Sequence, residues 1–171
     1  MYILHVRVPI TWWTALGLLA GTAVSLLLWR PLAARTGWHP GWSLMSLLLL
    51  SSTLALTFGP GLQRSPPTLT QCLPTRATKL LRSLAQLGGD LENVLNLLVL
   101  APVVIAVVLA TRRTAYGVWL AIALPGLIEI VQSQIPGRVC STADYCANAV
   151  GGVSAAVLTA AVLRRRRAFP G

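Results

Sequence analysis

Charge is what this sequence has least of, and acidic charge is the scarcest kind. The 171 residues include four Asp and Glu residues against 14 Lys and Arg residues, and charged residues make up 11% of the chain. Soluble domains carry about a quarter of charged residues, whereas this chain is 55% hydrophobic and has a mean hydropathy of +0.70. The composition therefore excludes an ordinary soluble domain and predicts a single membrane domain over residues 1–171.

The excess of basic residues gives a formal net charge of +10. In a soluble chain such a balance would suggest nucleic-acid binding. Here the basic residues flank long apolar runs, which is typical of residues that orient a membrane protein. We therefore expect a lipid bilayer around the chain and no nucleic-acid partner.

Histidine is also scarce, with only His5 and His39 in the chain. The topology expected below places these two residues on opposite sides of the membrane. The sequence therefore shows no paired metal site, no zinc-protease motif and no Ser/His hydrolase arrangement. We expect neither a metal nor a cofactor.

Five apolar runs are present, each long enough to cross a bilayer. A helix rises about 1.5 Å per residue, so a run of about 20 residues spans the hydrocarbon core of about 30 Å. The fold class predicted is an all-α bundle of about five transmembrane helices. The expected helices cover residues 11–29, 42–58, 93–110, 116–135 and 145–163.

A polar loop over residues 59–92 separates the second and third runs. Within it, Leu80, Leu81, Leu84 and Leu87 recur at helical spacing, which predicts a short amphipathic helix over residues 77–87 on the membrane surface. Two later prolines, Pro102 and Pro125, fall inside expected helices. Each removes a backbone hydrogen bond, so we expect kinks there.

The positions of Lys and Arg predict the orientation of the chain. With the C-terminus in the cytoplasm, the inside carries eight basic residues: Arg30, Arg35, Arg112, Arg113 and the four arginines of 164–167. The outside then carries six: Arg7, Arg64, Arg76, Lys79, Arg82 and Arg138. Because basic residues near helix ends are enriched in the cytoplasm, we expect the N-terminus outside and the C-terminus inside.

Three cysteines are present. Cys72 and Cys140 fall in loops expected outside, which is an oxidising location, while Cys146 begins the fifth run. We predict a Cys72–Cys140 disulfide. Spacing alone does not choose the connectivity, so other pairings and a pair between chains stay open.

The polar residues of the apolar segments gather at one expected membrane face. All four acids, Asp90, Glu92, Glu129 and Asp144, fall there together with Arg138. Ionised groups below the interface are costly unless paired, and Arg138 is the expected partner of the carboxylates. The alternatives are that Asp144 only caps the fifth helix and that Glu129 extends to the interface. We predict one ligand-binding or functional polar cluster, with catalytic residues unknown, formed by Glu92, Asn96, Glu129, Gln132, Arg138, Asp144 and Asn148.

Three ordered elements on consecutive apolar helices resemble the VanZ-like family of small bacterial integral membrane proteins. They are the segment from Glu92 through Asn96 to Pro102, the Glu-x-x-Gln at 129–132, and the series Arg138, Asp144, Asn148, Gly151 and Gly152. The resemblance covers about residues 91–157 and the helix end at 56–60. Ser141, Val104 and Glu92 stand where the family has Asp, Gly and Asp. The resemblance implies a bacterial plasma-membrane protein of the cell envelope, linked to glycopeptide resistance and notably to teicoplanin.

Three functions remain open on the sequence. The first is an outward-facing polar site that binds or modifies an envelope component, such as an envelope precursor, a lipid headgroup or a lipophilic glycopeptide. The second is an enzyme that uses Glu129 and Asp144 as an acid and base pair, since partial burial can raise the pKa of a carboxyl group. The third is a structural or assembly protein whose working surfaces are stripes of small residues. Substituting the two carboxylates distinguishes a site from a scaffold.

Overall fold

The computed structural model describes residues 2–3, 6–7, 11–59, 76–89, 91–135, 137–138 and 141–168. The side chains of Cys72 and Cys140, which carry the predicted disulfide, lie outside this range, as does Asp90.

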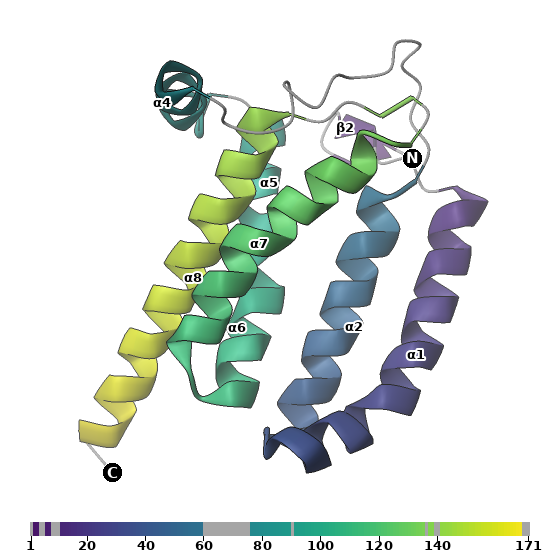
Figure 1. The fold of residues 1–171 in the computed structure, drawn as a ribbon, viewed down its shortest axis with the longest axis vertical. Coiled ribbons are helices and arrows are strands. Elements are labelled where there is room, and N and C mark those ends of the chain that lie inside the picture. The colour runs from purple at the N-terminus through teal and green to yellow at the C-terminus, as the bar shows by residue number, and fades with distance from the viewer. Residues whose placement is uncertain are drawn as a thin grey trace.

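Helices dominate the described chain (Figure 1). Two short strands, β1 (Tyr2–Ile3) and β2 (Val6–Arg7), pair antiparallel near the N-terminus. The helices are α1 (Trp12–Thr36), α2 (Pro40–Thr57), α4 (Ala77–Ala85), α5 (Leu91–Val99), α6 (Ala101–Thr111), α7 (Thr114–Gln132) and α8 (Thr142–Ala168).

Within the residues that the structure describes, five segments are long and apolar enough to cross a membrane, which confirms the predicted all-α bundle of about five transmembrane helices. They are Trp12–Thr36, Pro40–Thr57, Leu91–Thr111, Thr114–Gln132 and Thr142–Arg166. The short helix predicted over 77–87 is present as α4, which ends two residues earlier, at Ala85, and which Figure 1 shows crosswise beside the start of α8.

The helix ends differ from those predicted, because hydropathy marks the apolar part of a helix and not its caps. The first helix was expected to end at residue 29, but α1 continues through Pro31 to Thr36 and stops where Gly37 takes a left-handed φ of 69°. The last helix was expected over 145–163, but α8 already begins at Thr142.

The third span is interrupted between α5 and α6. Pro102 is the second residue of α6, a position where its missing N–H is tolerated, and the residue before α6 is Leu100. The predicted kink at Pro102 therefore appears as a break between two helices. Pro125 lies inside α7 without ending it.

Close packing of small residues holds the bundle together. On α8, a Cβ on Gly151 would collide with the carbonyl of Leu97 on α5, and one on Gly152 would lie 2.7 Å from Cβ of Ala121 on α7. The buried core continues along these helices with Val104, Val108, Ala121, Ala155 and Ala156. Large apolar side chains stay exposed along the five spans, such as Leu27 on α1 at 74%, as expected of helices that contact lipid.

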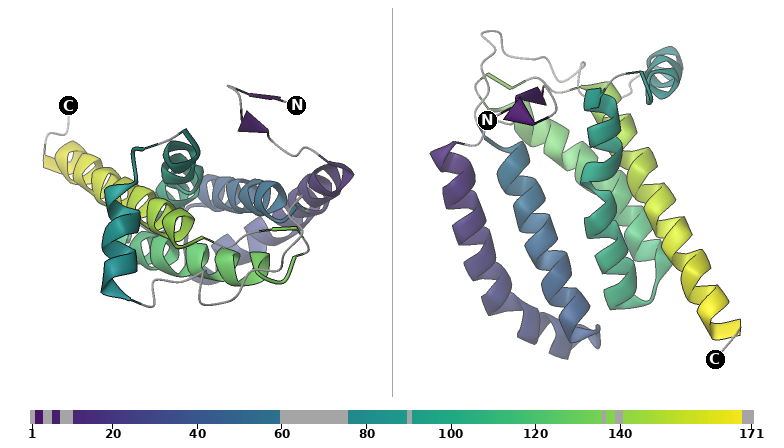
Figure 2. Two further views of the ribbon diagram at one scale, coloured as in Figure 1. Left: turned by 90° about the horizontal axis from the view of Figure 1, so that it is seen from above. Right: turned by 180° about the vertical axis from the view of Figure 1, so that it is seen from behind.

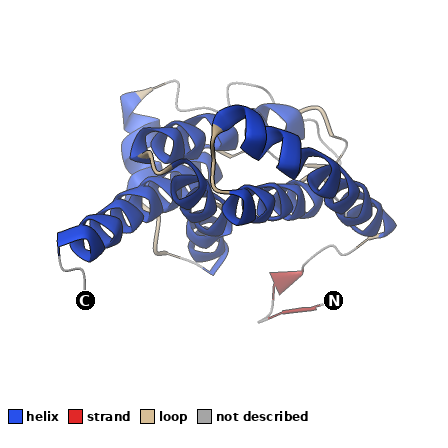
Figure 3. Ribbon diagram, turned by 90° about the horizontal axis from the view of Figure 1, so that it is seen from below, coloured by secondary structure: helices blue, strands red, loops and turns tan. Residues whose placement is uncertain are grey.

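Helix α1 packs chiefly against α2. Gly17 lies against Ala55 and Gly21 against Ser51, so the two backbones approach closely. The view from behind in Figure 2 shows this pair beside the group formed by α5 to α8. Seen from below in Figure 3, α1 and α8 lie at opposite edges of the bundle.

The two ends of the bundle differ in character. At one end, called the polar end, α2 and α7 finish and α5 and α8 begin (Figure 1). The opposite end, called the basic end, holds the turns 37–39 and 112–113 and the C-terminal part of α8. The candidate site lies at the polar end.

Candidate functional site

The last turn of α2 supplies hydrogen-bond acceptors to the polar end. The final carbonyl groups of a helix have no partner within it, and cationic donors are favoured there. Arg138 supplies such donors: its Nε donates to the carbonyl of Gly59 at 2.8 Å, and its Nη2 donates to the carbonyl of Thr57 at 2.6 Å. A longer contact of 3.4 Å joins Nη2 to the carbonyl of Leu56. Arg138 therefore binds the segment after α7 to the end of α2.

Gln132 reinforces this junction from the last residue of α7. Its Nε2 donates to the same Thr57 carbonyl at 3.0 Å, and its side chain is buried. The carbonyl of Thr57 thus accepts from two side chains that are distant in sequence. Gln132 and Arg138 together fix α7 against α2.

Glu129 lies one turn before Gln132 and is 2% exposed. Its Oε2 accepts a hydrogen bond of 2.7 Å from the backbone N–H of Ser141, directly before α8. The N-terminus of a helix carries partial positive charge, so a carboxylate is favoured at this position. Glu129 faces the protein interior and the start of α8, and does not extend to the interface.

Ser141 caps α8. Its Oγ accepts from the backbone N–H groups of Ala143 at 3.2 Å and Asp144 at 3.4 Å. The interpretation of Asp144 as the cap of this helix is therefore wrong: Asp144 lies in the first turn, and the capping side chain is Ser141.

Arg138 shares an electrostatic environment with both carboxylates. Burial lowers the pKa of the Arg138 guanidinium, and the charges of Glu129 and Asp144 act in the opposite direction. The hydrogen bonds of Arg138 nevertheless go to backbone carbonyls at and just after the end of α2, and not to the described carboxylates. Negative and positive groups therefore alternate across the polar end. The partly negative C-terminal end of α2 contacts the cationic Arg138, and the carboxyl group of Glu129 contacts the partly positive N-terminal end of α8.

Asn148 lies one turn further along α8 and is 7% exposed. Its Nδ2 donates to the carbonyl of Asp144 at 2.9 Å. Its Oδ1 is buried and accepts no hydrogen bond from any residue that the structure describes. A buried acceptor of this kind is rare in folded proteins and calls for a partner such as a ligand group or a water molecule.

The hydrogen bonds given so far involve no residue of α5, although this helix packs against α8. Glu92 is exposed and Asn96 is partly buried, while the neighbouring Asn93 is buried and donates from Nδ2 to the carbonyl of Gln86 at 3.0 Å. This bond ties α5 to the turn after α4. Of the seven predicted residues, the described hydrogen bonds and charges bring together Glu129, Gln132, Arg138, Asp144 and Asn148.

Sequence reasoning missed Ser141, Asn93 and the backbone carbonyls of α2. The Ser-x-x-Asp spacing at 141–144 resembles a capping box and could have indicated the cap. Every residue has a backbone carbonyl group, so the sequence does not show that the carbonyl of Thr57 accepts hydrogen bonds from Gln132 and Arg138. The segment 56–60 was part of the resemblance to the VanZ-like family. The structure gives a reason for this, because carbonyl groups of this segment accept hydrogen bonds from Arg138.

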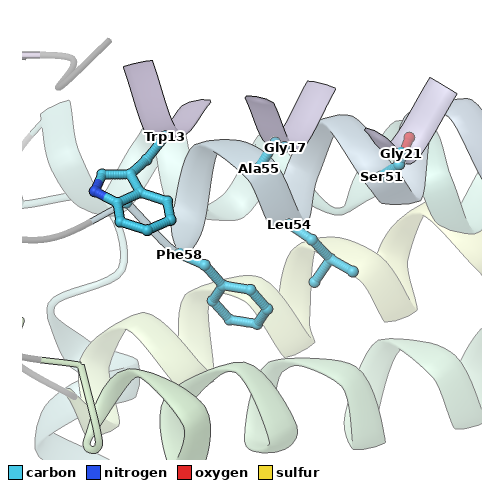
Figure 4. A pocket seen from close by; sticks show the side chains of 8 residues that line it. Trp13, Gly17, Gly21, Ser51, Leu54, Ala55 and Phe58 are labelled. Carbon is cyan, nitrogen blue, oxygen red and sulfur yellow. The ribbon is translucent and has the colours of Figure 1, made fainter. Parts of the chain in front are cut away.

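An apolar cavity of about 330 Å³ adjoins the polar end between α1 and α2 (Figure 4). Its lining includes Trp13, Leu54, Phe58 and Gly59. Gly59 is also the residue whose carbonyl accepts from Arg138. The cavity and the polar groups are therefore neighbours, an arrangement that suits a molecule with a polar head and an apolar chain.

Comparison with known proteins identifies a family. The model of the VanZ/LLP1 family matches residues 42–164. The match includes nearly all of α2, all of α4 to α7 and most of α8, and so every polar group described above. No curated protein and no solved structure matches the chain.

Proposed function

The chain belongs to the VanZ/LLP1 family, and from that premise we propose that its polar end binds the headgroup of an amphiphilic envelope component. The binding residues are Glu129, Arg138, Asp144 and Asn148, with Gln132 holding Arg138 in place through their shared acceptor. Glu92 and Asn96 stay outside the proposed set, because Glu92 is exposed on α5.

The buried Oδ1 of Asn148 is the observation that carries the proposal. Leaving a buried acceptor without a partner costs about 1 to 3 kcal/mol. A ligand hydroxyl, amide or ammonium group would satisfy it. Since carboxylates also accept hydrogen bonds, Glu129 and Asp144 favour the same donor-rich chemistry, which sugar, peptide and aminated headgroups provide.

Arg138 adds the opposite preference. Its Nη2 donates to the end of α2 and its Nε to the carbonyl of Gly59 just after that helix, so Nη1 is the guanidinium nitrogen that forms no hydrogen bond within the described residues. Guanidinium groups bind carboxylates and phosphates. We therefore assign to the ligand a headgroup with both donors and an anionic group. An envelope precursor, a phospholipid and a lipophilic glycopeptide all meet this description.

The cavity between α1 and α2 is the proposed place for part of the apolar chain of that ligand. Its volume of about 330 Å³ lies within the usual range of small-molecule pockets, about 300 to 1,000 Å³. Its position next to Gly59 would put the chain in the bilayer while the headgroup meets Arg138.

We place the protein in the bacterial plasma membrane with the basic end in the cytoplasm and the polar end outside. Labelling of single cysteines introduced into the segment 164–171 should therefore require permeabilised cells. Labelling of intact cells at this segment would put the polar end inside and exclude a ligand bound from the outer face.

The functional test uses a deletion strain complemented with the wild type, Glu129→Gln or Asp144→Asn. The readouts are teicoplanin susceptibility and the lipid profile of the envelope. We expect both variants to lose the phenotype of the wild type while reaching the membrane in equal amounts. Glu92→Gln is the matched control, because it makes the same change on an exposed carboxyl group. Full activity of Glu129→Gln and Asp144→Asn at wild-type abundance would indicate a scaffold and not a binding site.

A further inference from the structure

A second apolar hollow of about 400 Å³ lies between α2, α6 and α7, with Leu32 of α1 also in its lining, at the basic end of the molecule. Its lining includes Trp38, Leu47, Val103, Tyr116 and Trp119. We call it the aromatic groove. Trp119 is 71% exposed and Tyr116 is 45% exposed, so the groove opens sideways to the surroundings of the bundle.

The groove covers most of the depth of one leaflet. On α2 its lining runs from Ser43 to Leu50, and on α7 from Tyr116 to Ala123. Each stretch corresponds to a rise of about 11 Å at 1.5 Å per residue. One leaflet contributes about 15 Å of hydrocarbon, so the groove runs from the interface toward the bilayer centre.

A cation and two aromatic rings stand together at the interfacial end of the groove. The guanidinium carbon of Arg113 lies 5.8 Å from the ring centroid of Tyr116, and Arg113 itself is exposed. The rings of Tyr116 and Trp38 are 6.1 Å apart. The N–H of His39 donates to the carbonyl of Ala110 at 3.0 Å, which holds the two turns at this end against each other.

Charge at this end has one sign. Arg35 and Arg112 lie in or beside the turns with Arg113, and further arginines follow on the last turns of α8. The acidic residues that the structure describes, Glu92, Glu129 and Asp144, belong to the polar end. An anion at the mouth of the groove therefore meets cations and no described carboxylate.

We propose that the aromatic groove is a binding site for an anionic phospholipid. One acyl chain lies along α2, α6 and α7, and the phosphate group contacts Arg113 beside Trp38 and Tyr116. Basic pockets between transmembrane helices suit anionic headgroups, and aromatic rings at this depth suit the interface. This site is separate from the polar end and does not depend on the ligand proposed there.

Native mass spectrometry of the full chain purified in detergent tests the proposal, with phosphatidylglycerol and phosphatidylcholine as the two probes. We expect saturable binding of one phosphatidylglycerol and weaker binding of phosphatidylcholine. Arg113→Gln should weaken phosphatidylglycerol binding about fivefold, since one basic residue near a lipid surface contributes about 1 kcal/mol. Arg164→Gln, on the exposed end of α8, is the matched control and should change binding less than twofold.

A second pair of variants tests the groove itself. Ala123→Phe fills the groove from an exposed position of α7 and should remove the saturable binding of phosphatidylglycerol. Ile122→Phe adds a ring to the neighbouring exposed position, outside the lining, and should leave the binding intact. Equal binding of both lipids, an equal effect of Arg113→Gln and Arg164→Gln, or unchanged binding in Ala123→Phe would each overturn the proposal, because the retained lipid would then be a non-specific shell.

Discussion

Arg138→Leu is expected to lower the free energy of unfolding by about 2 to 4 kcal/mol. The wild-type guanidinium makes two short hydrogen bonds at the end of α2, of 2.6 Å to the carbonyl of Thr57 and 2.8 Å to the carbonyl of Gly59 just after the helix. Hydrogen bonds to charged groups contribute about 1.5 to 3 kcal/mol each. The third contact, of 3.4 Å, adds little. Because Arg138 is only half-buried, part of this loss is recovered by solvent at the freed carbonyls.

Arg138→Lys separates geometry from charge. Lys keeps the positive charge near the end of α2 but lacks the planar fork that reaches two carbonyls. We expect it to retain about half of the stabilisation. Unfolding of each purified variant in mixed micelles, followed by far-UV circular dichroism, gives the free energies.

The same assay tests the coupling of Arg138 with Glu129. No ion pair joins the described side chains of Arg138 and Glu129, but the charge of Glu129 acts on the guanidinium group of Arg138. Each single change therefore loses the same favourable charge interaction, which the double variant loses only once. Arg138→Leu combined with Glu129→Leu should cost about 0.5 to 1 kcal/mol less than the sum of the single changes. Additive costs, or an Arg138→Leu variant as stable as the wild type, would refute the reasoning.

Three further predictions concern packing, capping and the cysteines. Gly151→Ala should destabilise the protein by about 1 to 3 kcal/mol because its Cβ would collide with α5, whereas Gly88→Ala, with open space around it, should be nearly neutral in the same unfolding assay. Ser141→Ala should cost about 1 kcal/mol through loss of the α8 cap, and Ser141→Asn should retain most of it; equal stability of the two would count against the cap. Mass spectrometry after thiol trapping should find Cys72 joined to Cys140, and two free thiols would exclude that bond.

The number of transmembrane spans could be predicted because a bilayer-length apolar run is a property of composition alone. The helix ends could not, since they depend on single residues. Gly37 ends α1 by taking a left-handed backbone conformation, and Ser141 starts α8 with its hydroxyl group. Both residue types occur elsewhere in the chain without these roles.

The location of the candidate site at one membrane face follows from chain order and span length, which place Glu129, Arg138 and Asp144 together. Their partners do not follow, because Arg138 binds backbone carbonyls, which every residue has. The face of α5 was also unpredictable. Its break from α6 makes it a separate helix, and packing turns Asn93 inward while Glu92 is exposed.

The most direct test of the proposed site is to identify what the protein retains from its own membrane. Wild type, Asn148→Leu and Glu129→Gln are purified from host membranes in mild detergent, and the extracted amphiphiles are quantified by lipid mass spectrometry. If the polar end binds an envelope component, one headgroup class should co-purify in about equimolar amount with the wild type and be lost from both variants, while Glu92→Gln retains it. The same amphiphiles in the same amounts in all four proteins would contradict a binding site at the polar end.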